Sequence, residues 1–330
     1  MTKTLEHIAL FGSSGQIGGA ILNALLAPAV PNYSPKIRCF FQSSDEGKVD
    51  AVQDDDRIEK VKVADFKDVG QLKQKLEGVD AVVVALNGPA LEAQYSILDA
   101  AAEAGVKRFI PSEFGHHHLY RAPGDDGARM HPYWDVKNRF NERMVLHPAV
   151  LSGKMTYTIV GTGDFYDQPR ETYWCAHANP DIPEEYVMPV IGDPDAKADF
   201  TKITDMAQYV AALLSRPSTS ANATLNFVSD TLSQREMADL LHSASGKPVD
   251  LDFVSEEQAH EYIANPDSAP ERAKQSAFAA DFWYIVKLTQ GMGLFRRHPS
   301  EVHNDLYPEV HATLFSEYLA FTVGKKAMSA

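Results

Sequence analysis

The stretch His7–Leu26, HIALFGSSGQIGGAILNALL, decides the fold of this chain. It opens with a short apolar run that predicts a buried strand, and a helix is expected to follow the glycines. Gly12, Gly15 and Gly18 stand at GxxGxxG spacing. One such glycine makes a tight turn, one lets backbone N–H groups approach a pyrophosphate, and one lets the helix pack close to the strand. The pattern predicts a dinucleotide site at the helix N-terminus, although an ordinary strand–helix turn can need the same glycines.

The composition is that of a globular protein and limits its partners. Lys and Arg total 31 against 45 Asp and Glu, which gives a formal net charge of −14. This excess argues against a nucleic-acid-binding surface, because such a surface needs concentrated cations. Two cysteines imply no disulfide framework. No run approaches the ~18 apolar residues of a membrane span, and the N-terminus lacks the apolar core of a signal peptide. We therefore expect a cytoplasmic enzyme with neither membrane nor nucleic-acid partner.

Strands and helices alternate through the first half of the chain. Apolar runs predict strands at 37–41, 59–63, 81–86, 106–110 and 155–160, with helices at 69–76, 91–104 and 133–145. The alternation predicts a Rossmann-like α/β fold, a doubly wound parallel sheet whose strands end at one ligand-binding edge. The residues expected to bind a dinucleotide at that edge are Gly12, Ser14, Gly15, Gln16, Ile17, Gly18, Gln42, Ser43, Ser44, Lys48, Asp65, Phe66, Leu86, Asn87, Gly88 and Pro111.

The end of the second predicted strand bears on which dinucleotide binds. An acidic residue there favours NAD, and a nearby arginine favours NADP. The strand ends instead in Gln42, Ser43 and Ser44, with Lys48 further on and two acidic residues between them. Two hydroxyls and one lysine can bind a 2′-phosphate. NADP(H) is therefore favoured over NAD(H).

A tyrosine and a lysine form the candidate catalytic pair. Tyr133 and Lys137 are four residues apart in a segment expected to be helical, so their side chains share one helix face. A nearby ammonium favours the phenolate and lowers the pKa of a tyrosine. We expect hydride transfer with Tyr133 as proton donor, oriented and activated by Lys137, which also contacts the cofactor. Ser112, at the end of the preceding strand, can hydrogen-bond a substrate carbonyl or the tyrosine hydroxyl.

Several of these motifs together resemble a known group of proteins. The glycine pattern, the heptapeptide FIPSEFG at 109–115, Lys137 and the segment YTIV at 157–160 are similar to the NmrA-like and isoflavone reductase-like branch of the short-chain dehydrogenases. The resemblance implies an NADP-binding Rossmann core, a smaller substrate domain, and reduction of conjugated, usually aromatic, small molecules of secondary metabolism. It also implies that Lys137 is the essential catalytic residue. The tyrosine four residues earlier is often absent from that family but is present here.

The chain departs from the family pattern at two places. The family commonly has Val-Arg after the second strand, where this chain has Phe41-Gln42, so the usual clamp on the 2′-phosphate is in question. After the sixth strand, the family's Asn-x-Phe is replaced by Gly163-Asp164-Phe165. Phe165 matches a residue that the resemblance places near the nicotinamide. Its altered neighbours suggest a different substrate pocket.

The histidines at 116–118 and His131 invite a metal hypothesis. Consecutive histidines point in different directions, and ligand spacings such as H-x₃-H are missing. A polar loop over the active site, with a histidine possible in the substrate pocket, is favoured, and no metal is expected.

We expect a dinucleotide-binding domain at 1–160 with returns near 199–228, and a smaller, discontinuous α+β substrate-binding domain from 161–198 and 229–330. The predicted function is an NADP(H)-dependent reductase of a bulky conjugated or aromatic molecule, acting as a monomer or homodimer. Two alternatives stay open: a non-enzymatic NAD(P)-binding sensor of the NmrA type that binds a protein partner, and an enzyme that couples cofactor redox to a cyclisation. The substrate, and the choice among C=C, C=O and C=N, lie beyond the sequence.

Overall fold

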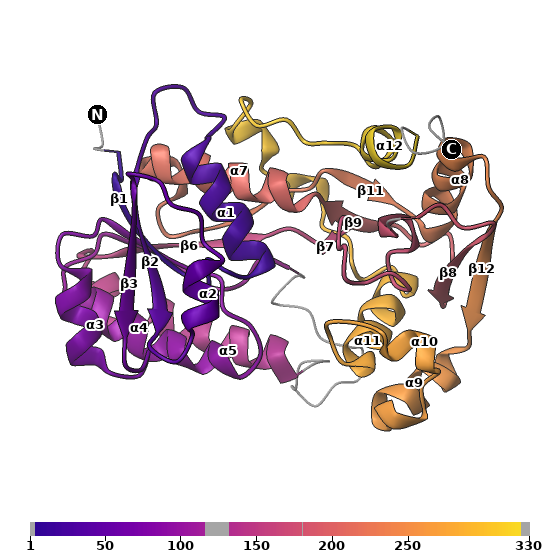
Figure 1. Cartoon of the computed structure of the whole chain (residues 1–330), viewed down its shortest axis with the longest axis horizontal. Helices are drawn as coiled ribbons and strands as arrows, with labels where there is room; N and C mark the ends of the chain where they lie inside the picture. Colours follow the sequence, from indigo (N-terminus) through magenta and orange to yellow (C-terminus); the bar gives the residue numbers. More distant parts are fainter. Residues whose placement is uncertain (1–3, 116–131, 180, 325–330) are drawn as a thin grey trace. The chain divides into compact units, whose positions relative to one another are not determined.

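The computed structural model describes residues 4–115, 132–179 and 181–324 (Figure 1). The chain divides into two compact units. Unit 1 consists of Met1–Gly161, Ile203–Phe227 and Ser300–His311. Unit 2 consists of Thr162–Lys202, Val228–Pro299 and Ala312–Ala330.

Unit 1 is built on a parallel seven-stranded sheet, which confirms the predicted Rossmann-like fold. The strands run in the order β10-β6-β5-β4-β1-β2-β3. From β1, the chain builds outward to β3 on one side and then from β4 to β6 on the other, so the order reverses between β1 and β4. The strands are β1 His7–Phe11, β2 Lys36–Gln42, β3 Ile58–Val63, β4 Ala81–Val84, β5 Arg108–Ile110, β6 Thr156–Gly161 and β10 Ala223–Asn226.

Helices cover both faces of this sheet. In Figure 1, α1 and α7 lie together on one face, and α3, α4 and α5 lie on the other. All four residues of β4, AVVV, are buried, as expected for a central strand covered on both sides. The helices and short turns of unit 1 are α1 Gln16–Leu26, α2 Glu46–Asp50, α3 Val69–Leu76, η1 Gly88–Glu92, α4 Ala93–Glu103, α5 Pro132–Val145, α6 Pro148–Leu151, α7 Ile203–Ser215, η3 Pro217–Ser220 and η6 Asn304–Leu306.

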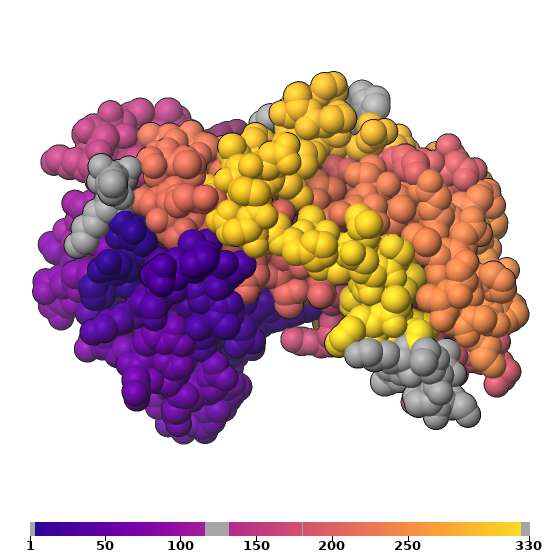
Figure 2. Space-filling view, turned by 90° about the horizontal axis from the view of Figure 1, so that it is seen from above, coloured from indigo at the N-terminus to yellow at the C-terminus, as the bar shows by residue number. Residues whose placement is uncertain are grey.

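Two later segments of the chain return to unit 1. Residues 203–227 supply α7, η3 and β10, and residues 300–311 lie against them, as the golden and salmon surfaces of Figure 2 show. Arg216 donates to the Glu309 carboxylate at 2.6 Å, and the hydroxyls of Thr219 and Tyr307 are 2.8 Å apart. The return at 300–311 is not among the segments expected from the sequence.

Unit 2 is a mixed α+β arrangement. Its three-stranded sheet has the order β11-β9-β7, and a separate parallel pair joins β8 to β12. The expected return near 199–228 begins too early, because β9 belongs to this smaller sheet. The elements of unit 2 are β7 Asp164–Phe165, η2 Ala176–Ala178, β8 Tyr186–Ile191, β9 Ala198–Thr201, β11 Asp230–Leu232, α8 Gln234–Ser245, β12 Val249–Val254, α9 Glu256–Ala264, η4 Pro266–Ser268, α10 Glu271–Lys274, α11 Ala280–Gly291, α12 Phe315–Leu319 and the π-helical turn η7 Ala320–Gly324. A further turn, η5 Pro299–Glu301, lies where the chain passes from unit 2 to unit 1.

Candidate active site

The glycine loop joins β1 to α1 through contacts that exclude larger side chains. Gly12 has a φ of +88°, and a Cβ placed on it would lie 2.3 Å from the Ala85 carbonyl oxygen. A Cβ on Gly18 would lie 2.0 Å from the carbonyl oxygen of Gly12. Gly12 therefore makes the turn beside the end of β4, and Gly18 lets α1 pack onto that turn. The tight turn and the close helix packing are those predicted from the glycine spacing, and the contact with a pyrophosphate remains a prediction.

The N-terminus of α1 suits an anion. Gly15 is the N-cap residue of the helix, and no side chain caps the helix there. The N–H of Gly15 itself donates to Gly12 at 3.0 Å. Next to it, the side-chain Nε2 of Gln16 is buried and has no hydrogen-bond partner in the described part of the chain. Uncapped helix N–H groups and an amide donor without a partner in the described residues match the phosphates of a dinucleotide, so the residues present fit that group.

The predicted ribose-binding residues gather where β2 and β3 end. The Ser43 hydroxyl donates to the Val63 carbonyl at 3.0 Å, which ties the two strand ends together. The Gln42 amide reaches the Asp65 carboxylate at 3.4 Å. Lys48 lies on α2, and its exposed ammonium pairs with Asp45 at 2.9 Å. A 2′-phosphate bound by Lys48 would therefore compete with the Asp45 carboxylate. Of the other predicted residues here, Phe66 is buried against Phe11, and Ser44 is exposed.

The end of β4 brings Gly88 next to Tyr133. Gly88 has a φ of +59°, and a Cβ placed on it would lie 3.8 Å from the Tyr133 hydroxyl. Leu86 and Asn87 directly precede this glycine. The phenol of α5 therefore lies at the strand edge where the dinucleotide is predicted, and Tyr133 is exposed, at 36%.

Ser112 has a different contact from the one predicted. Its side chain is buried, and its hydroxyl donates to the Leu86 carbonyl at 2.6 Å. Its backbone N–H donates to the Gln94 side chain at 2.8 Å. Because a serine hydroxyl has one proton, Ser112 can donate to a substrate only by releasing Leu86. In this structure it connects the ends of β4 and β5, next to Pro111.

Lys137 is anchored to the loop that follows β5. Its Nζ donates to the main-chain oxygen of Glu113 at 2.7 Å. Burial lowers the pKa of the Lys137 ammonium, and the negative charge of Glu113 raises it in part. The lysine lies one helical turn after Tyr133 on α5. Both proposed catalytic side chains thus belong to one helix at the ligand edge of the sheet.

Two polar residues beside Lys137 are not among the site residues predicted from the sequence. Glu113 is only 5% exposed, and its side-chain Oε2 accepts a hydrogen bond from the Asn141 Nδ2 at 2.8 Å. Asn141 is itself buried, and it follows Lys137 by four residues on the same face of α5. That spacing was the available signal, because it extends the Tyr-x-x-x-Lys pattern by one more turn.

Phe165 is the one predicted site residue that belongs to unit 2. It lies in β7, where it pairs with Thr201 of β9, and its side chain is buried. Its predicted contact with the nicotinamide remains a prediction.

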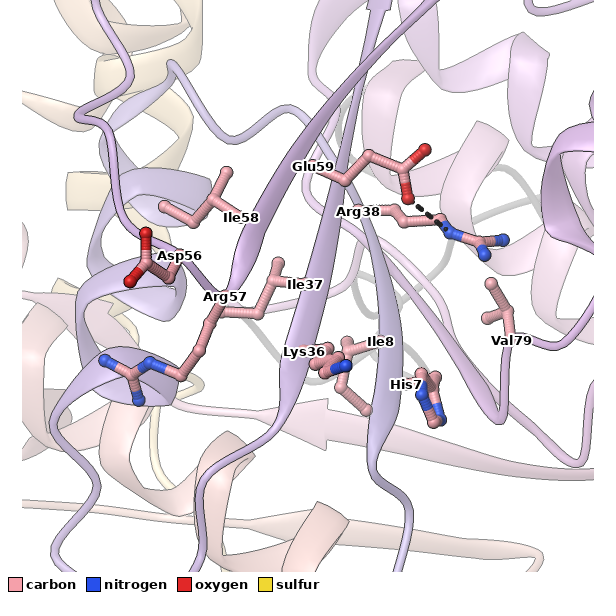
Figure 3. A pocket seen from close by; sticks show the side chains of 10 residues that line it. All are labelled: His7, Ile8, Lys36, Ile37, Arg38, Asp56, Arg57, Ile58, Glu59 and Val79. Atoms are coloured by element: carbon pink, nitrogen blue, oxygen red, sulfur yellow. Dashed lines mark hydrogen bonds and ion pairs between the residues drawn. The ribbon is translucent and has the colours of Figure 1, made fainter.

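Two hollows of unit 1 are distinct from the predicted dinucleotide edge. One, of about 340 Å³, lies at the amino ends of β1, β2 and β3. There Arg38 reaches the Glu59 carboxylate, with His7 and Lys36 at the strand starts (Figure 3). The other, of about 410 Å³, lies between α1 and α7, and among the predicted residues only Gln16 lines it.

The metal hypothesis rests on the histidines at 116–118 and on His131, and these residues lie outside the described residues. Within residues 4–115, 132–179 and 181–324, no group of three or more His, Cys, Asp or Glu side chains is arranged to hold a metal ion. Across the same residues, no helix has the length and hydrophobicity of a membrane span.

The model of the NmrA-like family matches residues 4–319. The chain belongs to the NmrA-like family. Phenylcoumaran benzylic ether reductase PT1 of Pinus taeda is 26% identical over 96% of this chain and 98% of its own. The asnovolin J 5′,6′-dehydrogenase nvfM of Aspergillus novofumigatus is 25% identical over 99% of this chain and 91% of its own. These matches confirm the predicted resemblance.

Solved structures confirm the fold. The structure of AtPrR2 with NADP+ and (+)-pinoresinol has a TM-score of 0.73, at 22% identity over 98% of this chain and 100% of that one. A ternary complex of leucoanthocyanidin reductase from Vitis vinifera has a TM-score of 0.71, at 19% identity over 96% of this chain and 99% of that one. At these identities the likeness establishes the architecture alone.

Proposed function

We propose that this protein is an NADPH-dependent reductase of a bulky conjugated or aromatic small molecule, in secondary-metabolite biosynthesis. The observation that carries the proposal is the placement of Tyr133 and Lys137 on α5 at the ligand edge of the sheet, with Lys137 bonded to Glu113. The family supports it, because curated relatives of nearly full coverage are named reductases of phenylcoumaran and pinoresinol compounds. We further propose that it acts in the cytoplasm as a monomer or homodimer.

NADPH would supply the hydride. The residues of this chain would bind the cofactor and the substrate and transfer a proton. The glycine loop and the N-terminus of α1 would hold the pyrophosphate, as helix N-termini do. Ser44 and Lys48 would bind the 2′-phosphate, with Asp65 and Phe66 beside the adenosine. Gly88, after β4, has no side chain, so the cofactor would approach the main chain closely there.

Tyr133 would give a proton to the substrate atom that becomes negative as the hydride arrives. Lys137, as a cation, would stabilise the negative charge that develops on the substrate. It would also stabilise the Tyr133 phenolate that is left after the proton is given up. The cationic role requires a protonated lysine. Because burial lowers the pKa of Lys137, activity should fall as the pH rises through that value. Ser112 would act by holding the ends of β4 and β5 together.

The test has two stages. Titration with NADPH and NADH should show tighter binding of NADPH, and a screen of aromatic enones, ketones and imines should find a class that oxidises the cofactor. Lys137→Met should then reduce kcat by about 100-fold or more while NADPH still binds, in line with the usual contribution of acid–base groups. Lys107→Met, which removes an exposed lysine, should leave turnover unchanged.

Full activity of Lys137→Met would contradict the assignment. Tight NADPH binding with no turnover on any substrate class would instead favour the non-enzymatic sensor. A product that is cyclised, with cofactor returned to its starting state, would favour coupled cyclisation.

A further inference from the structure

We propose that Glu113 is a positioning residue that holds the Lys137 ammonium in place through its main-chain oxygen and keeps it charged through its carboxylate. The inference rests on the proposed function, since it assigns a role within the same site. It adds a residue to which neither the family match nor the sequence pattern gives a role.

The first observation is the backbone strain at the loop after β5. Phe114 has a φ of +41°, which is unfavourable for a bulky aromatic residue. The N–H of Phe114 donates to the Val160 carbonyl of β6 at 3.0 Å, and the N–H of Glu113 donates to Pro111 at 2.9 Å. Such conformations cost roughly 1–3 kcal/mol and persist where the surroundings impose them. Here the imposed turn leaves the Glu113 oxygen 2.7 Å from the Nζ of Lys137.

The second observation is the buried carboxylate of the same residue. At 5% exposure, an ionised Glu113 needs hydrogen-bond donors, and Asn141 supplies one to Oε2 at 2.8 Å. Asn141 lies one helical turn after Lys137, so a single face of α5 holds the lysine and the amide that fixes its counter-charge. Glu113 is thus bound by this face of α5 through both its main chain and its side chain.

The third observation concerns the other charges near Lys137. On α5, Asp135 pairs with Arg139 one turn later. On α4, which packs against α5, Asp99 pairs with Arg143 and His147, and Tyr95 lies near the same contact. Two further carboxylates are Glu92 on η1, which also packs against α5, and Glu142 on α5, which accepts from Asn138. Within the described residues, Glu113 is the charged group that raises the pKa of Lys137 against the effect of burial. This carboxylate therefore favours the charged form of the lysine.

The experiment measures the protonation of Lys137 without turnover. Trace acetylation of the full-length protein, free of cofactor, is followed against pH by peptide mass spectrometry, because only the neutral amine reacts. The exposed Lys107 serves as the internal reference. The midpoint at Lys137 in the wild type is compared with that in Glu113→Gln, which retains the main-chain acceptor and an oxygen for Asn141 but removes the charge.

Glu113→Gln should lower the Lys137 midpoint by about one pH unit, as expected for the loss of one nearby opposite charge. Glu113→Asp, which keeps a carboxylate, should restore most of the shift, and Lys107 should be unchanged in both. If Glu113→Gln does not fold, Asn141→Ala provides the test. Without that donor the buried carboxylate takes up a proton more readily, so the Lys137 midpoint should again fall.

The proposal would be overturned if the Lys137 midpoint were the same in the wild type and in Glu113→Gln. If only Asn141→Ala folds, an unchanged midpoint in that variant would have the same meaning. In the active enzyme, the alkaline limb of kcat should move with the labelling midpoint while the affinity for NADPH stays the same. The labelling result does not depend on turnover. Failure of the reductase assignment would therefore appear as absent turnover, and failure of the Glu113 assignment would appear as an unchanged Lys137 midpoint.

Discussion

The Nζ of Lys137 lies 2.7 Å from the main-chain oxygen of Glu113, which anchors the middle of α5 to the loop that ends β5. A lysine side chain has four rotatable bonds, so such an anchor removes much of its freedom before any ligand binds. Sites built on rigid elements hold their catalytic groups more precisely than sites on loops. The bond thus gives α5, through Lys137, a fixed place relative to the strand ends.

Tyr133→Phe tests whether the phenol delivers the proton. With Tyr133 beside Gly88 at the strand edge, loss of the hydroxyl should reduce kcat by about 100-fold or more and leave the affinity for NADPH within a factor of about two. Steady-state kinetics with a substrate from the screen measures the effect. Tyr95→Phe is the matched control, because Tyr95 packs edge-on against Phe140 and lies outside the predicted site. Equal kcat values for wild type and Tyr133→Phe would leave Lys137 as the sole acid–base group.

Gly18→Ala and Gly19→Ala form a matched pair in adjacent positions of α1. A Cβ on Gly18 would lie 2.0 Å from the Gly12 carbonyl, whereas a Cβ on Gly19 would lie 3.4 Å from its nearest neighbour, the Ser13 oxygen. We expect Gly18→Ala to destabilise the protein by roughly 1–3 kcal/mol and to weaken NADPH binding, because the loop must move. Gly19→Ala should be neutral or stabilise by up to about 1 kcal/mol, because alanine favours helix. Urea unfolding and NADPH titration measure both, and similar behaviour of the two variants would refute the packing argument.

These glycines show what local sequence can predict. Their positions follow from the demands of one turn and one helix, and a parallel sheet with helices on both faces follows from the alternation of strands and helices with right-handed crossovers. The proposed role of Glu113 could not be predicted, because it depends on the positive φ of Phe114, which no residue type at that position signals. The return of residues 300–311 was also missed. That segment has no helical or strand periodicity, and its contacts, such as Tyr307 with Thr219, come from residues distant in sequence.

Lys48→Ala and Asp45→Asn test the basis of cofactor choice. The two side chains pair at 2.9 Å and the lysine is exposed, so the pair itself contributes little to stability. Lys48→Ala should weaken NADPH binding by about twofold to fivefold and leave NADH binding unchanged, whereas Asp45→Asn should strengthen NADPH binding by a similar factor. Fluorescence titration with both cofactors provides the comparison. Lys60→Ala, which breaks a similar exposed pair with Asp54, controls for net charge. An equal effect of Lys48→Ala on both cofactors would show that the lysine does not recognise the 2′-phosphate.

His177 in unit 2 should make the stability of the protein depend on pH. Burial lowers the pKa of His177 to about 4, and its Nε2 donates to the Tyr166 carbonyl, so the ring is neutral in the folded state. Its Nδ1 is buried without a hydrogen-bond partner in the described structure, which leaves a second proton nothing to donate to.

The direction of this pH dependence follows from the protonation of His177 in the folded and unfolded states. An unfolded chain binds a proton at His177 near pH 6.5 and the folded chain only near pH 4, so the unfolded state gains protons first as the pH falls. The stabilisation is complete above about pH 6.5 and is lost between there and about pH 4, to a total of about 3 kcal/mol. His177→Gln keeps a donor for Tyr166 but does not titrate. In urea unfolding from pH 7 to pH 4, the wild type should lose about 3 kcal/mol more than this variant. Parallel losses in the two proteins would show that His177 is not the group responsible.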